Sequence, residues 1–189
     1  MLEAIQSMDA GLLLAIQSIR LDFLNPIIEV FTQLGNAGIL WIVLSVAMLC
    51  FKKTRKAGAV SLLAMIFGLL CTNVVLKHLV ARPRPWLDVP GLVNLVYEGD
   101  PNSFPSGHTC AAFAAGVAWL KLLPWKWGRV GAMVLAVCMG LSRLYVGVHY
   151  PTDVLAGAVV GTLCGLLALW VYRRFLNREH APDAVRRSN

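Results

Sequence analysis

Long apolar runs separated by short polar breaks are the main pattern of this chain. The runs cover about residues 37–51, 57–80, 106–123, 129–146 and 152–172. Crossing the hydrocarbon core of a bilayer takes about 20 mostly apolar helical residues. A helix also satisfies its backbone hydrogen bonds within its own segment, which the bilayer requires. The pattern therefore predicts an all-α, multi-pass transmembrane helical bundle with five clear spans.

The first 34 residues have a different pattern. Over residues 2–19 the apolar positions recur mostly every three or four residues between polar ones. One apolar face on an otherwise polar helix is typical of a helix that lies in the membrane interface. We therefore expect interfacial, amphipathic N-terminal helices over 1–34, a transmembrane domain over 35–175 and a basic cytoplasmic tail over 176–189. A sixth span is the alternative for residues 1–34.

The composition also indicates a membrane protein. Of the 189 residues, 58% are hydrophobic and 14% are charged, whereas a soluble domain has about 45–50% apolar and about 25% charged residues. The five cysteines all fall inside apolar runs and show no paired spacing. They are typical of small core residues and do not indicate a disulfide framework or a metal site.

The net charge of +7 is unevenly distributed along the chain. Twelve of the seventeen Lys and Arg residues lie in three groups at the ends of apolar runs, at 52–56, 121–129 and 173–187. Such groups are typical of cytoplasmic loops, so we expect no nucleic-acid partner and a cytoplasmic C-terminus. The opposite ends of the spans then face the non-cytoplasmic side, near residues 77–85, 105–108 and 143–153.

Lys77, Arg82 and Arg84 form the first polar cluster at that face. A single lysine at the end of a span commonly extends to the lipid headgroups, although an ionisable group embedded in a membrane segment is by default a functional candidate. The positive-inside rule disfavours three cations at this face. Their presence predicts that the protein holds an anion there.

The segment Pro105-Ser106-Gly107-His108 opens the third apolar run. Ser106 is a good N-cap residue, and capping alone would be its ordinary role. The N-terminus of a helix also offers unpaired N–H groups and the positive end of the helix dipole. Because Gly107 lets the backbone approach a ligand closely, the segment is a candidate phosphate cradle with His108 beside it.

Ser142, Arg143, His149 and Asp153 lie where the last two runs meet. Pro151 suits the first turn of a helix, which places His149 just before that helix and Asp153 just inside it. The carboxylate can accept a hydrogen bond from one ring nitrogen of His149, which leaves the other nitrogen free as a nucleophile. Taken separately, Asp153 is an ordinary acid at a helix start and His149 an ordinary interfacial residue.

Together the three clusters resemble the signature of the type 2 phosphatidic acid phosphatases, K-x6-R-P, then P-S-G-H, then S-R-x5-H-x3-D. All eleven specified positions are met, by Lys77, Arg84 and Pro85, by Pro105, Ser106, Gly107 and His108, and by Ser142, Arg143, His149 and Asp153. The resemblance implies a helical membrane core, commonly with six spans, and makes residues 35–175 the catalytic domain.

The resemblance also implies a reaction. His149 is the nucleophile that forms a phosphohistidine, Asp153 orients it, and His108 acts first as general acid and then as general base. The residues that hold the phosphoryl oxygens are Lys77, Arg84, Ser106, Gly107 and Arg143. Phosphoryl transfer depends mainly on positioning and charge neutralisation, which three fixed cations supply. The sequence has no carboxylate cluster suited to Mg²⁺ and no His/Cys set suited to zinc, so we expect no metal and no cofactor.

The expected substrate is a membrane lipid phosphate. Small bacterial members of the family often act on undecaprenyl diphosphate, which recycles the carrier lipid of cell-wall synthesis, and others act on phosphatidylglycerophosphate or phosphatidate. The short chain and the non-cytoplasmic site favour undecaprenyl diphosphate, in the plasma membrane. No oligomeric state is predicted.

Three other functions share part of the pattern. A transporter would place charged or broken positions along its spans, whereas here they gather at one face. A lipid-phosphate binder without turnover would not need His108, His149 and Asp153. A vanadium haloperoxidase shares the same set of residues but is a soluble protein.

Overall fold

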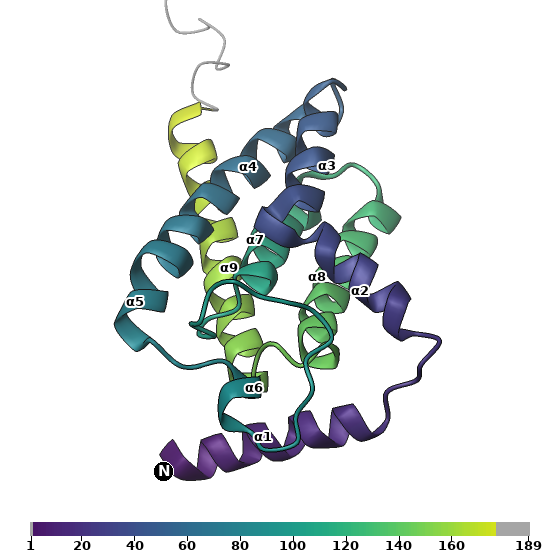
Figure 1. The fold of residues 1–189 in the computed structure, drawn as a ribbon. Coiled ribbons are helices and arrows are strands. Elements are labelled where there is room, and N and C mark those ends of the chain that lie inside the picture. Colours follow the sequence, from purple (N-terminus) through teal and green to yellow (C-terminus); the bar gives the residue numbers. More distant parts are fainter. Residues whose placement is uncertain (1, 177–189) are drawn as a thin grey trace, which may run out of the picture.

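Helices build the fold over residues 2–176, the part of the chain that the computed structural model describes. Four long helices form its centre (Figure 1): α4 (Arg55–Leu69), α7 (Gly107–Leu122), α8 (Lys126–Tyr145) and α9 (Pro151–Val171). Since α7 packs against the other three, it is the central helix of the bundle. The predicted all-α fold is confirmed.

Shorter elements complete the described chain. The α-helices are α1 (Leu2–Ser18), α2 (Asn25–Leu34), α3 (Ile39–Leu49), α5 (Lys77–Val80) and α6 (Pro85–Asp88). The remaining helical turns are η1 (Asn36–Gly38), η2 (Leu70–Leu76) and η3 (Tyr172–Leu176). Because η2 joins α4 to α5, the chain from Arg55 to Val80 runs as one helix of 26 residues.

Three glycines on one face of α9 set its distance from α7. A Cβ atom at Gly157 would lie 2.5 Å from the carbonyl oxygen of Ser106, and one at Gly165 would lie 2.9 Å from Cβ of Val117. Gly161 faces α7 in the same way. Small residues at a spacing of four allow membrane helices to pack at close range. This contact holds the beginning of α9 beside the beginning of α7.

Three helices of the described chain are long and apolar enough to cross a membrane: Arg55–Val80, Lys126–Tyr145 and Pro151–Phe175. A fourth crossing is formed if Asn25–Leu34 and Asn36–Leu49, which are bent by 51° at the break between them, count as one span. The break falls at Gly35, between the N-terminal region and the apolar run that begins near residue 37. The multi-pass bundle is thus confirmed at the level of three or four spans.

The runs at 37–51 and 106–123 form shorter helices than the sequence predicts. α3 has 11 residues and α7 has 16, and at 1.5 Å per residue even α7 is about 24 Å long. The hydrocarbon core is about 30 Å thick. The central helix α7, which packs against α4, α8 and α9, is therefore too short by itself to cross that thickness.

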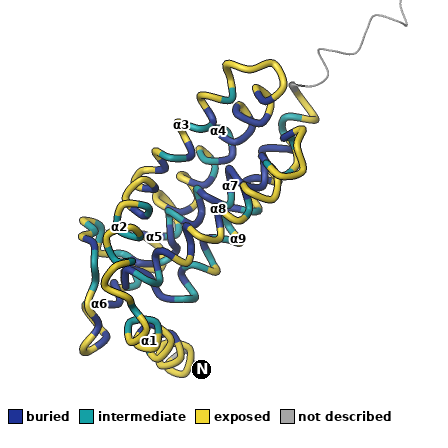
Figure 2. The backbone as a smooth tube through the Cα atoms, turned by 90° about the vertical axis from the view of Figure 1, so that its right-hand side faces the viewer, coloured by how far each residue is buried: buried dark blue, intermediate teal, exposed yellow. Residues whose placement is uncertain are grey.

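The outward side chains of the bundle are apolar. Leu155, Val159 and Leu163 on α9 are all exposed, and exposed positions follow the outer sides of the helices (Figure 2). A soluble monomer rarely exposes a continuous apolar surface of this extent. Such a surface is what a lipid environment requires.

Helix α1 crosses one end of the bundle, next to α6 (Figure 1). Met8 and Leu12 on its outer side are exposed, while Asp9 and Leu13 on its inner side are fully buried. The helix therefore has one buried and one exposed face, with apolar residues on both and Asp9 on the buried one. The domain bounds stay a prediction, and the predicted basic tail lies, from residue 177 onward, outside the described residues.

Candidate active site

The predicted site residues gather at the end of the bundle that α1 crosses. Five of the eight line a single cavity of about 710 Å³, namely Lys77, Arg84, Gly107, His108 and His149. The other three, Ser106, Arg143 and Asp153, are fully buried directly behind them. Motifs that are more than 70 residues apart in the sequence are thus brought to one place by the ends of α5, α7, α8 and α9.

His149 lies in the short connection between α8 and α9 and is 1% exposed. Its Nε2 atom is 3.0 Å from Nη1 of Arg84. An arginine can only donate hydrogen bonds, so Nε2 accepts, and the proton of the neutral ring is on Nδ1. Burial lowers the pKa of His149 well below its usual value, and the charges of Arg84, Arg143 and Lys77 act in the same direction. The ring is therefore neutral near pH 7 and presents an unprotonated nitrogen toward the cavity.

Asp153 lies on the Nδ1 side of the ring. Its Oδ2 atom is 3.6 Å from Nδ1, which is longer than a hydrogen bond, and it accepts from the backbone N–H of Tyr150 at 2.9 Å. Catalytic hydrogen bonds are commonly long in unliganded enzymes and shorten with substrate. The structure thus brings the two predicted residues together, at a distance longer than the predicted hydrogen bond.

Two carboxylates from the loop between α6 and α7 form ion pairs with cations of the site. Asp100 forms an ion pair with Lys77, and Glu98 forms one with Arg143. Burial alone would raise the pKa of Asp100, but the hydrogen bond and charge of Lys77 outweigh it and hold that pKa below its usual value. Sequence reasoning did not assign either acid to the site. The signal was their position on the same face as three cations.

Arg84 is held in place mainly by the backbone. It is 1% exposed, and it donates to the carbonyl oxygens of Asp100 and Val148, each at 2.9 Å. Its Nη2 atom lies 3.6 Å from a carboxylate oxygen of Glu98. With the other Nη1 hydrogen directed at His149, the guanidinium fixes a positive charge beside the nucleophilic nitrogen.

The beginning of α7 forms the opposite wall of the site. Ser106 caps the helix as predicted, since its Oγ atom accepts from the N–H of Thr109. The first N–H groups of a helix have no partner within it, and Gly107 and His108 both line the cavity. Nε2 of His108 is 2.9 Å from Oδ1 of Asn36, so an amide orients this ring.

Asn36 and Thr32 are further residues that sequence reasoning missed. Asn36 contacts His108, and the hydroxyl of Thr32 accepts from Arg143. Both belong to the segment around the break between α2 and α3, where polar residues interrupt an apolar run. That interruption was the available signal, and it indicated only a break in the helix.

A family model for the PAP2 superfamily matches residues 58–177. This range contains all three motifs, α7, α8 and α9, and α4 except for its first three residues. The chain belongs to the PAP2 superfamily. The resemblance that the motifs predict is confirmed, and the protein is a membrane lipid phosphatase.

Individual relatives agree with the family. The chain is 31% identical over 152 residues to an undecaprenyl-diphosphatase of Sulfolobus acidocaldarius, a match that covers 78% of this chain and 70% of that protein. It is 34% identical over 173 residues to phosphatidylglycerophosphatase B of Bacillus subtilis, with coverages of 85% and 81%. The crystal structure of a transmembrane PAP2 type phosphatidylglycerolphosphate phosphatase from Bacillus subtilis is similar, with a TM-score of 0.74 at 32% identity over 91% of this chain and 88% of that one.

Proposed function

We propose that this PAP2 phosphatase hydrolyses its lipid substrate through a phosphohistidine on Nε2 of His149. The observation that carries the proposal is the position of Nε2, 3.0 Å from Nη1 of Arg84, in a cavity that Lys77 also lines. In the first step Nε2 attacks phosphorus, and the bond from phosphorus to the lipid or phosphate oxygen breaks. His108 gives a proton to that leaving oxygen. In the second step His108 takes a proton from water, the water oxygen bonds to phosphorus, and the bond from phosphorus to Nε2 breaks, which releases inorganic phosphate and free His149.

The phosphoryl oxygens are bound in this proposal by Lys77, Arg84, Ser106, Gly107 and Arg143. Since Glu98 and Asp100 pair with Arg143 and Lys77, the substrate phosphate takes the place of these two carboxylates. The three cations stabilise the charge of the transition state. We expect no metal requirement, so that EDTA leaves the activity intact. Strong inhibition by EDTA that Mg²⁺ reverses would contradict this mechanism.

The decisive test of the nucleophile is a trapped phosphoenzyme. Brief reaction with ³²P-labelled lipid phosphate and denaturation in alkali should leave label on the wild-type protein, because phosphohistidine survives base and is lost in acid. His149→Ala should lose both the label and the turnover. His78→Ala, at the same end of the bundle and outside the cavity, is the matched control and should keep both. Label on His149→Ala would assign the nucleophile to another residue.

The substrate that we favour is undecaprenyl diphosphate, which is converted to undecaprenyl phosphate. Beyond its polar end, the cavity has an apolar wall that α3 and α4 form with Ile42, Leu62, Met65, Ile66 and Leu69. A polar end joined to an apolar wall suits a phosphate on a long hydrocarbon chain. The relative from Sulfolobus acidocaldarius bears the name of this activity.

Phosphatidylglycerophosphate or phosphatidate is the alternative substrate, supported by the relative from Bacillus subtilis that is named for the first of these. Phosphate release from the three lipids, measured under the same conditions with the purified protein, separates the two proposals. A kcat/KM highest for undecaprenyl diphosphate supports the first, and a higher value for either glycerolipid rejects it.

We further propose a plasma-membrane protein with five or six spans and with the site on the non-cytoplasmic face, since the basic groups at 52–56 and 121–129, together with Arg173 and Arg174, belong to the other end and such groups are typical of cytoplasmic loops. Tyr97 is 89% exposed on the loop near the site. In a cysteine-free variant, Tyr97→Cys should react with an impermeant maleimide in intact cells, whereas Lys53→Cys should react only after lysis. The reverse result would invert the orientation.

A further inference from the structure

Arg82 lies on the side of His149 that faces away from the cavity. It follows α5 in the chain and does not belong to the residues that line the cavity. Its Nη1 atom donates to Oδ1 of Asp153 at 2.8 Å and to the hydroxyl of Thr152 at 2.7 Å. Of the three cations of the first motif region, Arg82 is therefore the one directed at the carboxylate rather than at the phosphate site.

The other terminal nitrogen of Arg82, Nη2, binds the N-terminal helix α1. Nη2 donates to Oδ2 of Asp9 at 2.8 Å, and Asp9 also accepts from the backbone N–H of Thr152 at 3.2 Å. The side chain of Asp9 is fully buried although it lies on an amphipathic helix. A buried carboxylate is costly unless it is paired and hydrogen-bonded, and here both conditions are met by residues next to the site.

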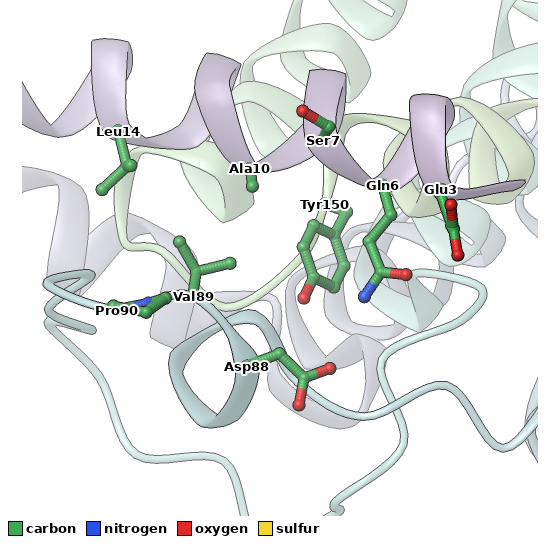
Figure 3. Close-up of a pocket in the computed structure, with 9 residues that line it drawn as sticks. All are labelled: Glu3, Gln6, Ser7, Ala10, Leu14, Asp88, Val89, Pro90 and Tyr150. Atoms are coloured by element: carbon green, nitrogen blue, oxygen red, sulfur yellow. The ribbon is translucent and has the colours of Figure 1, made fainter.

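Tyr150 completes the packing around this ion pair. The guanidinium carbon of Arg82 lies 3.7 Å from the centre of the Tyr150 ring, a cation–π contact. Tyr150 also lines a second cavity of about 380 Å³, together with residues of α1 and with Asp88, Val89 and Pro90 (Figure 3). Burial alone would lower the pKa of Arg82, but its hydrogen bonds and charge pairs with Asp9 and Asp153 outweigh it and raise that pKa above its usual value.

These contacts restrain both oxygens of Asp153. Oδ2 accepts from the N–H of Tyr150 and Oδ1 accepts from Arg82. An arginine that binds with two nitrogens has a fixed planar geometry that a lysine does not reproduce. Without Arg82, the carboxylate would keep one anchor and would be free to turn away from Nδ1 of His149.

We infer that Arg82 is a positioning residue for the reaction, and that together with Asp9 of α1 it holds the Asp153 carboxylate against Nδ1 of His149. The inference rests on the proposed function, because it needs His149 as the nucleophile. It assigns to α1 a part in the reaction beyond contact with the membrane. The helix supplies the buried carboxylate that holds the positioning arginine.

The test compares kcat and KM for Arg82→Gln, Arg82→Lys and Asp9→Asn in the full-length protein in lipid nanodiscs. Loss of a group that orients a functional histidine typically costs about 10- to 100-fold. We expect Arg82→Gln to lower kcat by about that factor with KM within about twofold of wild type. Arg82→Lys should recover part of kcat, and Asp9→Asn should lower it by a smaller factor than Arg82→Gln.

Two matched controls change the same residue types outside this contact. Arg20→Gln removes an arginine at the same end of the molecule that donates to the carbonyl of Val93, and Asp22→Asn removes an exposed aspartate near the end of α1. Both should keep the wild-type kcat. Thermal unfolding of every variant shows whether the fold is intact. If Arg82→Gln does not fold, Arg82→Lys and Asp9→Asn test the inference alone.

Each outcome separates this inference from the proposed function. If His149→Ala is inactive while Arg82→Gln, folded, has the wild-type kcat, the inference is wrong and the proposed function stands. A rise in KM with unchanged kcat would make Arg82 a phosphate ligand and would also overturn the inference. If His149→Ala is active, the proposed function itself fails.

Discussion

The two sides of the His149 ring have the same types of charged group and differ in how these groups are packed. On the cavity side, Lys77 pairs with Asp100, whose side chain is 39% exposed. On the α1 side, Arg82 pairs with Asp9 and Asp153, whose side chains are 0% exposed. Partly exposed ion pairs contribute about 0–1 kcal/mol, whereas breaking a buried pair costs about 3–5 kcal/mol. The cavity side therefore suits exchange of its anion for a phosphate, and the α1 side suits a permanent structure.

The largest effect is expected on the α1 side. Asp153→Asn removes the charge that faces Nδ1 and supplies an amide that can favour the wrong tautomer of the ring. In an enzyme with a comparable carboxylate–histidine pair, such a change costs about 10⁴ in kcat. We expect kcat to fall by roughly 10²- to 10⁴-fold with little change in KM, measured by steady-state phosphate release. If kcat/KM falls mainly because KM rises, Asp153 contacts the substrate instead.

The same chemical change on the cavity side should strengthen substrate binding instead of impairing catalysis. Asp100→Asn removes a carboxylate that competes with phosphate for Lys77. Because a partly exposed pair is worth at most about 1 kcal/mol, KM for the lipid and the inhibition constant of inorganic phosphate should both fall, by up to about fivefold. A rise in either constant would show that Asp100 supports binding instead of competing with it.

A smaller effect is expected in the pH profile. The groups that face His149 are Lys77, Arg84, His108, Arg143 and Asp153. Its pKa is lowered, so the neutral nucleophile persists as the pH falls, and kcat/KM should decline only below the usual histidine range near pH 6.5. Lys77→Met removes one cation that disfavours the protonated ring, so the decline should move to higher pH. An unchanged or lower midpoint would contradict the stated cause of the shift.

The motifs could be predicted from the sequence because each combines residue types that the chemistry requires at short spacing. His149 and Asp153 are four residues apart, and Ser106 to His108 are consecutive. The ends of neighbouring helices then bring these short segments together. What the sequence does not encode locally is the distance between Nδ1 and Asp153, which depends on contacts from α1 and from the loop before α7.

Asp9 shows why the other residues around the site could not be predicted from the sequence. Helical spacing places it on the inner face with Leu13, four residues later, and both are fully buried. A polar residue in an amphipathic helix is expected to face water, and only the crossing of α1 over the end of the bundle gives this one a buried partner. That partner, Arg82, is 73 residues away in the sequence. Glu98 and Asp100 escaped assignment for a similar reason, since loop residues carry no periodic pattern.

The polar end of the cavity and its apolar wall come from different parts of the chain. Its polar end comes from α5, from the arginine before α6, from the loop before α7, from the beginning of α7 and from the connection between α8 and α9, and its wall comes from α3 and α4. Substitutions at Ile42 or Met65 can therefore reshape the space for a lipid tail while every motif residue keeps its place. One hydrolytic centre can in this way serve new lipids over evolutionary time through changes in a wall that takes no part in bond breaking.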